Sequence, residues 1–399
     1  MNPWSGLKNL PREVWLICVS VLINRAGTMV LPFLVLYLTR DLHFPVAKAG
    51  LMIALYGVGA MVTAPVSGFL ADRFGALRIM KVSLFLSALV FFAFPLARTF
   101  AGIICVTILL AITNEMFRPA GLAAISHSVS PEQRKAAFAL NRLAINLGMS
   151  IGPAIGGFLA TLSFQFLFVI DGATSLLAGI VLAFFSLHLT SAVTDSEAGM
   201  EEKPAPAQSR RAFSDLQFLY FLLATVFVTI VFFQHLAAMP LFMVRNLHLS
   251  EAAYGLMFTI NTGLIVLLEV PLNLRISRWS HRTTLALGSF LCAAGFGSFA
   301  FAGGIGGVVI ALIVWTAGEM MLFPGMSAYV SHIASSERQG EYMGFYTMAF
   351  SIAFIIGPWM GTELLERFGA QVLWAVMFLI GSISAIMMFH LRDPSRPAS

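Results

Sequence analysis

Charged side chains are scarce in this chain of 399 residues, because Asp, Glu, Lys and Arg together make up 11% while apolar residues make up 58%. A soluble domain has about 25% charged residues, so this chain has too few to cover an apolar interior in water. Disordered chains are polar and charged, so the same composition excludes disorder. The composition predicts an all-α polytopic membrane protein, since a helix satisfies its backbone groups internally where lipid offers no water.

Cysteines and motifs for nucleotides or metals are scarce as well. Cys18, Cys105 and Cys292 are scattered through apolar runs, and they fit neither a disulfide framework nor a metal cluster. The sequence contains no G-x-x-x-x-G-K-[ST] string for ATP phosphates and no H-E-x-x-H zinc motif. Its basic residues follow short loops rather than one folded face, so no nucleic-acid partner is expected. We therefore expect no enzyme activity, no metal and no cofactor, and a proton gradient as the energy source.

About twelve apolar runs are long enough to cross a bilayer, which takes about 20 residues of helix. Polar or glycine-containing segments separate these runs, so each run is expected to be one membrane-spanning helix. The predicted spans are Val14–Leu38, Ala49–Leu70, Ile79–Leu96, Gly102–Ile125, Ala136–Leu162, Phe164–Leu187, Leu216–Met239, Ala252–Leu274, Thr284–Ala302, Gly307–Val330, Tyr342–Leu365 and Gln371–Leu391.

The basic residues between the spans are distributed unequally. Most of them lie at one set of helix ends, and the opposite ends carry only Arg40, Lys48, Arg98, Arg245 and Arg367. Cytoplasmic loops are the ones rich in Lys and Arg, so both termini are predicted to be cytoplasmic. Short loops and the absence of an N-x-[ST] glycosylation site suit the inner (plasma) membrane of a bacterium.

One long polar stretch divides the chain. It contains two prolines and several charged residues, which is typical of a linker. We therefore predict an N-terminal six-helix bundle at 1–190, a cytoplasmic linker at 191–212 and a C-terminal six-helix bundle at 213–399.

The two halves resemble each other at one fixed offset. Adding 205 to the residue number maps Leu42-His43 onto Leu247-His248, and it maps Gly152-Pro153 onto Gly357-Pro358. Two parallel six-helix repeats are a known transporter plan, in which the substrate site lies between the repeats near the middle of the bilayer. The repeat therefore predicts two pseudo-symmetric bundles and a small-molecule substrate.

A string with glycine at both ends follows the second predicted span. Gly68, Asp72, Arg73, Gly75 and Arg78 are its defining residues, and the glycines suit a tight turn. The string resembles the signature loop between the second and third helices of the major facilitator superfamily. This resemblance implies a gating role, in which the loop holds the two halves together in the outward-open state. The simpler alternative is a basic turn at the cytoplasmic face.

The fifth predicted span carries a string of small residues that is similar to the G-x-x-x-G-P-x-x-G-G motif of the superfamily's exporters. Small residues let helices approach closely and proline bends a helix, so the string is either a hinge for rocking or only a packing surface. Through this motif the chain most resembles the twelve-span drug–proton antiporters. The motif comprises Gly148, Gly152, Pro153, Gly156 and Gly157, and the second half retains Gly357 and Pro358.

Ionisable groups at bilayer depth are costly and are candidates for function. Arg25, beside Asn24, lies near the middle of the first span, and Glu319 lies near the middle of the tenth. Glu115 and Arg118 lie three residues apart in the fourth span, and therefore on one helix face. In the superfamily fold the first, fourth, seventh and tenth helices line the central cavity. The resemblance implies that these side chains face the substrate pathway.

The two acids are predicted to carry the coupled proton. Glu319 has no cation within one turn of its own helix, whereas Glu115 has Arg118 nearby. Because a neighbouring cation favours the charged form of a carboxyl group, we rank Glu319 first and Glu115 second as proton carriers. Arg25 or Arg118 would be the partner released on protonation. The alternative for Glu115 is a static ion pair that locks the first helix to the fourth.

Three further polar residues lie within the predicted spans. Gln234 and His235 lie toward the outer part of the seventh span, and we place them in the substrate cavity. Asp171 lies about two turns into the sixth span, where we expect it to cap or pair locally, with a direct functional role as the alternative.

The favoured function is proton-coupled efflux of amphipathic compounds by alternating access, carried out by a monomer in the lipid bilayer. A second hypothesis is proton-coupled uptake or exchange of a small anionic metabolite or nutrient, with Arg25 and Arg118 binding its carboxylate. A third is a membrane enzyme or a scaffold that transports nothing, and the missing catalytic motifs argue against the enzyme.

Overall fold

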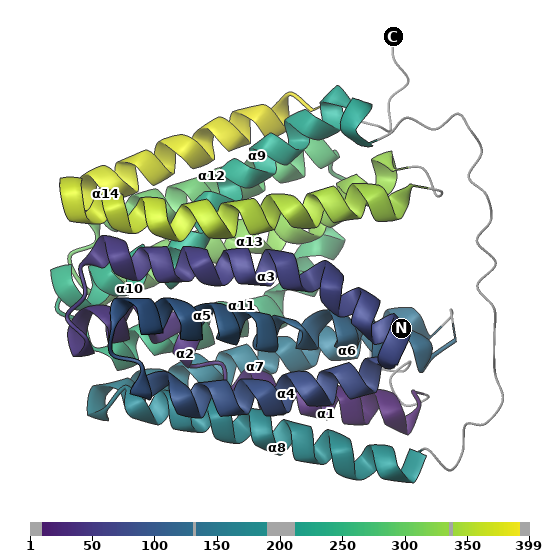
Figure 1. Ribbon diagram of the computed structural model, residues 1–399. Helices are drawn as coiled ribbons and strands as arrows, with labels where there is room; N and C mark the ends of the chain where they lie inside the picture. Colours follow the sequence, from purple (N-terminus) through teal and green to yellow (C-terminus); the bar gives the residue numbers. More distant parts are fainter. Residues whose placement is uncertain (1–9, 131–132, 190–211, 335–337, 392–399) are drawn as a thin grey trace. The chain divides into compact units, whose positions relative to one another are not determined.

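The computed structural model describes residues 10–130, 133–189, 212–334 and 338–391, and every regular element in these ranges is helical (Figure 1). Eleven helices are long and apolar enough to cross a membrane. The longest of these, Glu341–Phe389, contains Gly369 at φ 81° and ψ 174°, so it consists of two helices joined at a turn. Counting it as two confirms the predicted all-α fold with twelve spans.

The first half of the chain supplies six spans, and its first and fourth spans are each divided into two helices. A π-helical turn, Tyr37–Asp41, extends the first span beyond α2. The helices are α1 (Arg12–Ala26), α2 (Val30–Leu36), α3 (Val46–Phe74), α4 (Ala76–Ala93), α5 (Phe100–Glu115), α6 (Phe117–His127), α7 (Arg134–Leu162) and α8 (Gln165–Leu189).

The second half of the chain also supplies six spans. Its first span is divided as well, and a π-helical turn, Phe242–Asn246, extends it. The helices are α9 (Leu216–Phe232), α10 (Ala238–Leu241), α11 (Glu251–Ile276), α12 (His281–Ser298), α13 (Ile305–Ile333) and α14 (Gln339–Phe389).

Side chains cap the starts of several helices, as the sequence chemistry requires. Thr99 accepts a hydrogen bond from the Gly102 N–H at the start of α5, and Asp215 accepts from the N–H groups of Gln217 and Phe218 at the start of α9. The first N–H groups of a helix have no partner within the helix, so such oxygens fix where it begins.

Contacts within the chain define two units. Unit 1 comprises Met1–Phe44, Leu55–Ala198 and Ser250–Thr262, and unit 2 comprises Pro45–Ala54, Gly199–Leu249 and Gly263–Ser399. The predicted linker at 191–212 lies outside the described residues except for Ala212, so the predicted domain boundaries stay a prediction.

The first half of α11 belongs to unit 1 because its side chains contact helices from the first half of the chain. Arg40 forms an ion pair with Glu251, which is 6% exposed. The Tyr254 hydroxyl donates a hydrogen bond to the Pro32 carbonyl at 3.2 Å. The short segment Pro45–Ala54 belongs to unit 2 in the equivalent way.

The predicted repeat extends to details of the backbone. His43 and His248 have φ angles of 54° and 53°, which are rare for residues other than glycine, and these residues are separated by the offset of 205. The close contacts repeat too. A Cβ atom on Gly255 would lie 3.1 Å from the Gly157 Cα in unit 1, and one on Gly50 would lie 1.8 Å from the Thr362 hydroxyl in unit 2. The two halves therefore share one duplicated framework.

Each unit has its own apolar core. In unit 1, α4 packs against α8, and α1 packs against both α7 and α8. In unit 2, α12 packs against α13 and α14, and α9 packs against α14. An aromatic cluster formed by Phe242, Phe296, Phe299 and Trp374 fills part of the second core.

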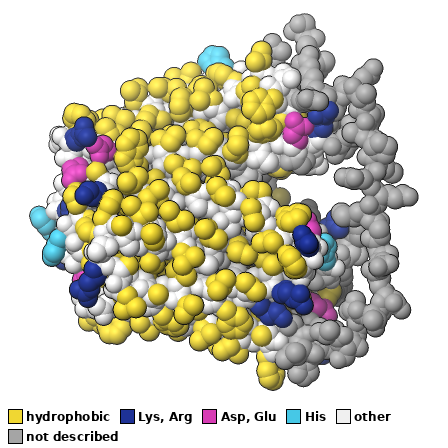
Figure 2. All heavy atoms as spheres, viewed as in Figure 1, with side chains coloured by type: hydrophobic (Ala, Val, Ile, Leu, Met, Phe, Trp, Pro, Cys, Tyr) yellow, Lys and Arg dark blue, Asp and Glu magenta, His cyan; other side chains and the backbone are white. Residues whose placement is uncertain are grey.

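Apolar side chains also cover the sides of the helices, whereas charged side chains gather at the helix ends (Figure 2). Phe69, Leu267 and Phe301 are 62%, 71% and 90% exposed. Apolar exposure on this scale is unfavourable in water and typical of a surface that faces lipid. The protein is therefore an integral membrane protein.

Candidate substrate and proton site

The first span is interrupted in unit 1, and a carboxylate from another helix holds the interruption. Helix α1 ends at Ala26, and α2 begins at Val30. The Met29 N–H donates to Asp171 Oδ1 and Oδ2 at 3.0 and 3.2 Å, and the Val30 N–H donates to Oδ2 at 2.9 Å. Asp171, on α8, is 3% exposed. It supplies the acceptors that the start of α2 needs, so it caps a helix as expected, although that helix belongs to another span rather than to its own surroundings in the sequence.

The glycines of the fifth-span motif lie directly against this interruption. A Cβ atom on Gly148 would lie 2.5 Å from the Arg25 Cβ, and one on Gly152 would lie 2.9 Å from the Ala26 carbonyl oxygen. Only residues without a side chain let α7 approach the backbone of the first span this closely. The motif therefore acts as a packing surface in this structure. Its role as a hinge stays a prediction, and α7 continues as one helix through Pro153.

The fourth span is interrupted as well. Helix α5 ends at Glu115, and α6 begins at Phe117. Pro119 has no N–H to offer to the Glu115 carbonyl, so the helical hydrogen bonding fails here. Beside this point the Ser67 hydroxyl donates to the neighbouring Met116 carbonyl at 2.8 Å. Glu115 consequently lies in the middle of the fourth span, where the helical hydrogen bonding is broken.

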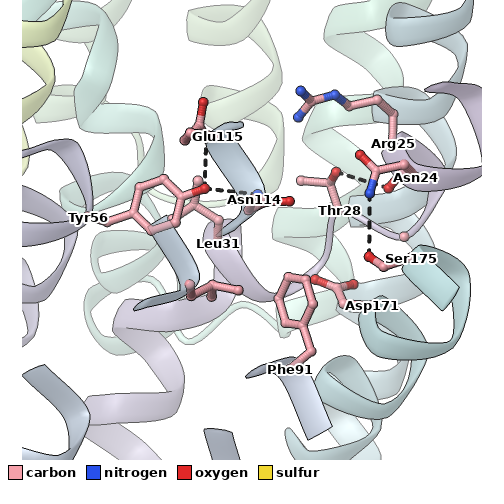
Figure 3. A pocket seen from close by; sticks show the side chains of 12 residues that line it. Asn24, Arg25, Thr28, Leu31, Tyr56, Phe91, Asn114, Glu115, Asp171 and Ser175 are labelled. Carbon is pink, nitrogen blue, oxygen red and sulfur yellow. Dashed lines mark hydrogen bonds between the residues drawn. The ribbon is translucent and has the colours of Figure 1, made fainter. Parts of the chain in front are cut away.

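Both interruptions line one small polar chamber in the interior of unit 1 (Figure 3). Its volume is about 40 Å³, which is room for a few water molecules. Polar side chains form most of its wall, and they come from the first, second, fourth and sixth spans. The lining residues are Asn24, Arg25, Gly27, Thr28, Leu31, Tyr56, Phe91, Leu110, Asn114, Glu115, Asp171 and Ser175.

Hydrogen bonds fix several of the lining side chains. The Tyr56 hydroxyl donates to Glu115 Oε1 at 2.8 Å, and Asn114 Nδ2 donates to that hydroxyl at 2.9 Å. On the other side of the chamber, Asn24 Nδ2 lies 3.4 Å from Ser175 Oγ, a long contact that crosses from α1 to α8. These contacts hold Glu115 and Asn24 in defined positions.

Arg25 lines the same chamber. Its Nε is buried and has no hydrogen-bond partner among the described residues. Figure 3 shows the Arg25 and Glu115 side chains separated across the chamber, and the ion pairs found in the described ranges do not include this pair. The predicted alternative of a static Arg25–Glu115 ion pair is therefore not formed in this structure.

The sequence prediction placed Arg118 and Glu115 on one helix face, and Met116 between them has helical dihedral angles of φ −63° and ψ −27°. Arg118 lies on α6, is exposed, and does not line the chamber, whereas Glu115 does. A substrate contact for Arg118 stays a prediction.

In unit 2 the seventh span is interrupted at His235. A 3₁₀ turn, Phe233–Leu236, follows α9. The Nδ1 of His235 lies 2.6 Å from the Phe232 carbonyl oxygen, and the imidazole stacks on Trp315 of α13 with ring centroids 6.2 Å apart. His235 therefore lies between the seventh and tenth spans, and its assignment to the substrate cavity stays a prediction.

Gln234, its neighbour, packs between helices. Its side chain is 0% exposed, and Nε2 donates to the carbonyls of Ile230 and Gly357 at 2.9 and 2.8 Å. A Cβ atom on Gly361 would lie 1.7 Å from Gln234 Oε1. Gln234 therefore joins α9 to α14 beside Pro358, and its assignment to the cavity stays a prediction.

Glu319 lies in the middle of α13, which is one continuous helix. It is partly buried and follows Trp315 by one helical turn, so both residues lie on the same helix face. On the adjacent α11, Asn273 Nδ2 donates to the Met320 carbonyl at 3.1 Å. Glu115 and Glu319 thus belong to different units, and their proton-carrying roles stay predictions.

The glycine-bounded loop joins α3 to α4 as a tight turn. Gly75 has φ 91°, which favours glycine. Asp72, Arg73 and Arg78 are exposed, and a side chain at Gly68 would meet open space. Gly68 lies within α3, so only Gly75 of the two predicted turn glycines is at the turn. The gating role stays a prediction.

Twelve spans in two duplicated halves, with interrupted helices around a buried polar chamber, define a polytopic membrane transporter. The sequence profile of the Major Facilitator Superfamily matches residues 16–244 and 222–399. The chain therefore belongs to the Major Facilitator Superfamily, as the resemblance predicted.

Similar proteins agree with this membership. The uncharacterized MFS-type transporter YqjV of Bacillus subtilis is 30% identical over 375 residues, covering 93% of this chain and 90% of that protein. Multidrug resistance protein 1 of Bacillus subtilis is 26% identical over 333 residues, covering 82% of this chain and 83% of that protein. A crystal structure of the peptide transporter POT matches with a TM-score of 0.80 at 13% identity, covering 95% of this chain and 94% of that one. This last similarity shows the fold alone.

Proposed function

We propose that this transporter exports amphipathic compounds in exchange for protons by alternating access. The observation that carries the proposal is the placement of Arg25 and Glu115 at the interruptions of two spans, on opposite sides of one polar chamber. Charged groups inside a membrane protein are retained where they bind ions or substrates. The similarity to Multidrug resistance protein 1 supports an amphipathic substrate and the outward direction.

In this proposal the proton moves on and off the two acids. Glu319 is the first carrier and Glu115 the second, and the proton gradient supplies the energy without a cofactor. A membrane potential or pH gradient can drive such a cycle only if each acid is reached by water in at least one state. The polar lining of the chamber beside Glu115 supports this requirement.

The second candidate is proton-coupled uptake or exchange of a small anionic metabolite. The unpartnered Nε of Arg25 favours it, because a buried guanidinium nitrogen without a partner can donate to a carboxylate. Direction of transport separates the two candidates.

The test is transport by the purified protein in liposomes with an imposed pH gradient. Ethidium serves as the amphipathic probe and lactate as the small anion. Ethidium should cross the membrane only when protons flow in the opposite direction. Glu319→Gln should reduce ethidium transport at least about tenfold, as expected when an acid that carries the coupled proton is removed. The matched control is Glu13→Gln, which alters an acid in the first turn of α1.

Ethidium transport that is independent of the pH gradient would contradict the antiport mechanism. Lactate movement in the same direction as protons, without ethidium movement, would instead establish the second candidate.

A further inference from the structure

We propose that the chamber in unit 1 binds the head group of a zwitterionic amphipathic substrate, with the carboxylate on Arg25 and the ammonium group on Glu115. This inference rests on the proposed transport function and names the substrate class of the same site. It assigns the chamber to one charged head, while the apolar remainder of the substrate lies outside it.

Arg25 has hydrogen-bonding capacity that its neighbours do not use. A guanidinium carries five donors in a planar fork that matches a carboxylate. Arg25 Nε is buried without a hydrogen-bond partner in the described part of the chain. Buried donors are almost always satisfied in folded proteins, so a missing partner points to a bound group or water. Arg25 reaches the chamber from the end of α1, one turn before the capped start of α2.

Glu115 is held in place, but only one of its two carboxylate oxygens accepts a hydrogen bond from a described residue. Its Oε1 accepts from the Tyr56 hydroxyl, and Tyr56 is itself fixed by Asn114. No described residue donates to Oε2, so one oxygen remains for a ligand donor. A carboxylate in this position suits an ammonium group, which donates three hydrogen bonds.

The chamber offers a ligand two charges of opposite sign. The third ionisable group in its wall, Asp171, already accepts from the backbone N–H groups of Met29 and Val30 with both of its oxygens. The two charges left for a ligand are Arg25 and Glu115, and they have opposite signs. A simple anion would lie near Glu115, and a simple cation would lie near Arg25, so each would meet repulsion. A zwitterion meets both groups favourably.

The volume of the chamber suits a head group rather than a whole drug-sized molecule. Pockets that enclose a drug-sized ligand measure about 300–1,000 Å³, whereas the chamber measures about 40 Å³. This space accommodates a head group of a few heavy atoms. Leu31, Phe91 and Leu110 complete the wall, which suits the apolar carbon that follows a polar head.

The experiment measures binding to purified protein in nanodiscs, without any gradient, by calorimetric titration. Four probes share one side chain and differ only in charge. They are phenylalanine (zwitterion), phenylalaninamide (cation), N-acetylphenylalanine (anion) and N-acetylphenylalaninamide (neutral). Phenylalanine should bind at least about tenfold more tightly than any of the other three, since each loses one charge-assisted interaction.

Variants assign the two charges. Arg25→Gln should abolish the preference for phenylalanine over phenylalaninamide, and Arg25→Lys should retain part of it. Glu115→Gln should abolish the preference for phenylalanine over N-acetylphenylalanine. Arg98→Gln, which alters an exposed arginine in a loop, should bind all four probes as the wild type does.

Equal affinity for the four probes, or binding of none of them, would overturn the proposal and leave the chamber as a site for water only. Retention of the phenylalanine preference in Arg25→Gln would also overturn it. Because the assay needs no proton gradient, its outcome is separate from that of the transport test. Selective binding without proton-coupled transport would refute the antiport proposal and leave the head-group site intact.

Discussion

At the scale of single residues, the interruption of the first span depends on the buried carboxylate of Asp171. This carboxylate has no cationic partner among the described residues. Asp171 is 3% exposed, and its carboxylate accepts hydrogen bonds from two backbone N–H groups at the start of α2. A buried charge is tolerated when hydrogen bonds and an oriented helix terminus replace its water. Asp171 therefore fixes where α2 begins, and through it the position of Arg25 at the end of α1.

Asp171→Ala should release the Met29 and Val30 N–H groups and destabilise the interruption. Hydrogen bonds to a charged acceptor contribute about 1.5–3 kcal/mol, so amide exchange at Met29 and Val30 should accelerate by at least about tenfold. Hydrogen exchange followed by mass spectrometry measures this directly. Asp41→Ala, which removes an exposed carboxylate in the same span, is the control and should leave these amides unchanged. Unchanged exchange in Asp171→Ala would show that the cap contributes nothing.

The site residues were only partly predictable at this scale. Arg25, Asn24 and Glu115 stand out because charges and amides are rare in apolar runs, and the structure brings these three together. Tyr56 and Ser175 gave no signal, since a single tyrosine or serine is ordinary in a membrane helix and only the fold brings them to Glu115 and Asn24.

At the scale of helices, the sequence revealed where spans lie but not where they are interrupted. The first span was predicted as continuous from Val14 to Leu38, although α1 ends at Ala26. Its cap comes from Asp171, which lies 142 residues from Met29 in sequence, so hydrophobic patterning carries no trace of it. In the fourth span Pro119 was the available signal, because proline removes a helical hydrogen bond.

The contact between α7 and the first span gives a prediction for Gly152. Replacing a glycine in a helix by alanine normally gains up to about 1 kcal/mol. At Gly152 the new Cβ would lie 2.9 Å from the Ala26 carbonyl oxygen and 3.0 Å from the Arg25 carbonyl oxygen, and backbone atoms cannot move aside as a flexible side chain can. Overpacking of this kind costs about 1–3 kcal/mol, so Gly152→Ala should lower the midpoint of thermal unfolding.

Gly263→Ala is the matched control, because a Cβ atom at Gly263 in α11 would have no neighbour within 4 Å. It should raise or preserve the unfolding midpoint. If Gly152→Ala were as stable as Gly263→Ala, the close approach of α7 to the first span would not exist in the protein.

At the scale of the whole molecule, the duplicated halves were visible in the sequence because the offset of 205 is preserved through turns as well as helices. The matching φ angles of His43 and His248 show the same duplication in the backbone. Which chain segments belong to which unit could not be predicted from the sequence. Residues 45–54 and 250–262 belong to the unit of the other half, and only side-chain packing decides this.

The charge distribution also predicts the orientation in the membrane. Alkaline phosphatase fused after Gly304 should be active, because this loop is predicted to face away from the cytoplasm, where the enzyme forms its disulfides. A fusion after Ser280 should be inactive, since that loop lies among the arginines of the predicted cytoplasmic side. The opposite pattern of activity would invert the topology.

The most direct test of the account is proton release by the purified transporter when substrate binds. A pH-sensitive dye in weakly buffered detergent solution reports protons displaced by ethidium or phenylalanine. The account predicts release by the wild-type protein, a large reduction in Glu319→Gln, and almost none when Glu115→Gln is added. Undiminished release in the double variant would contradict the central claim that these two acids carry the coupled proton.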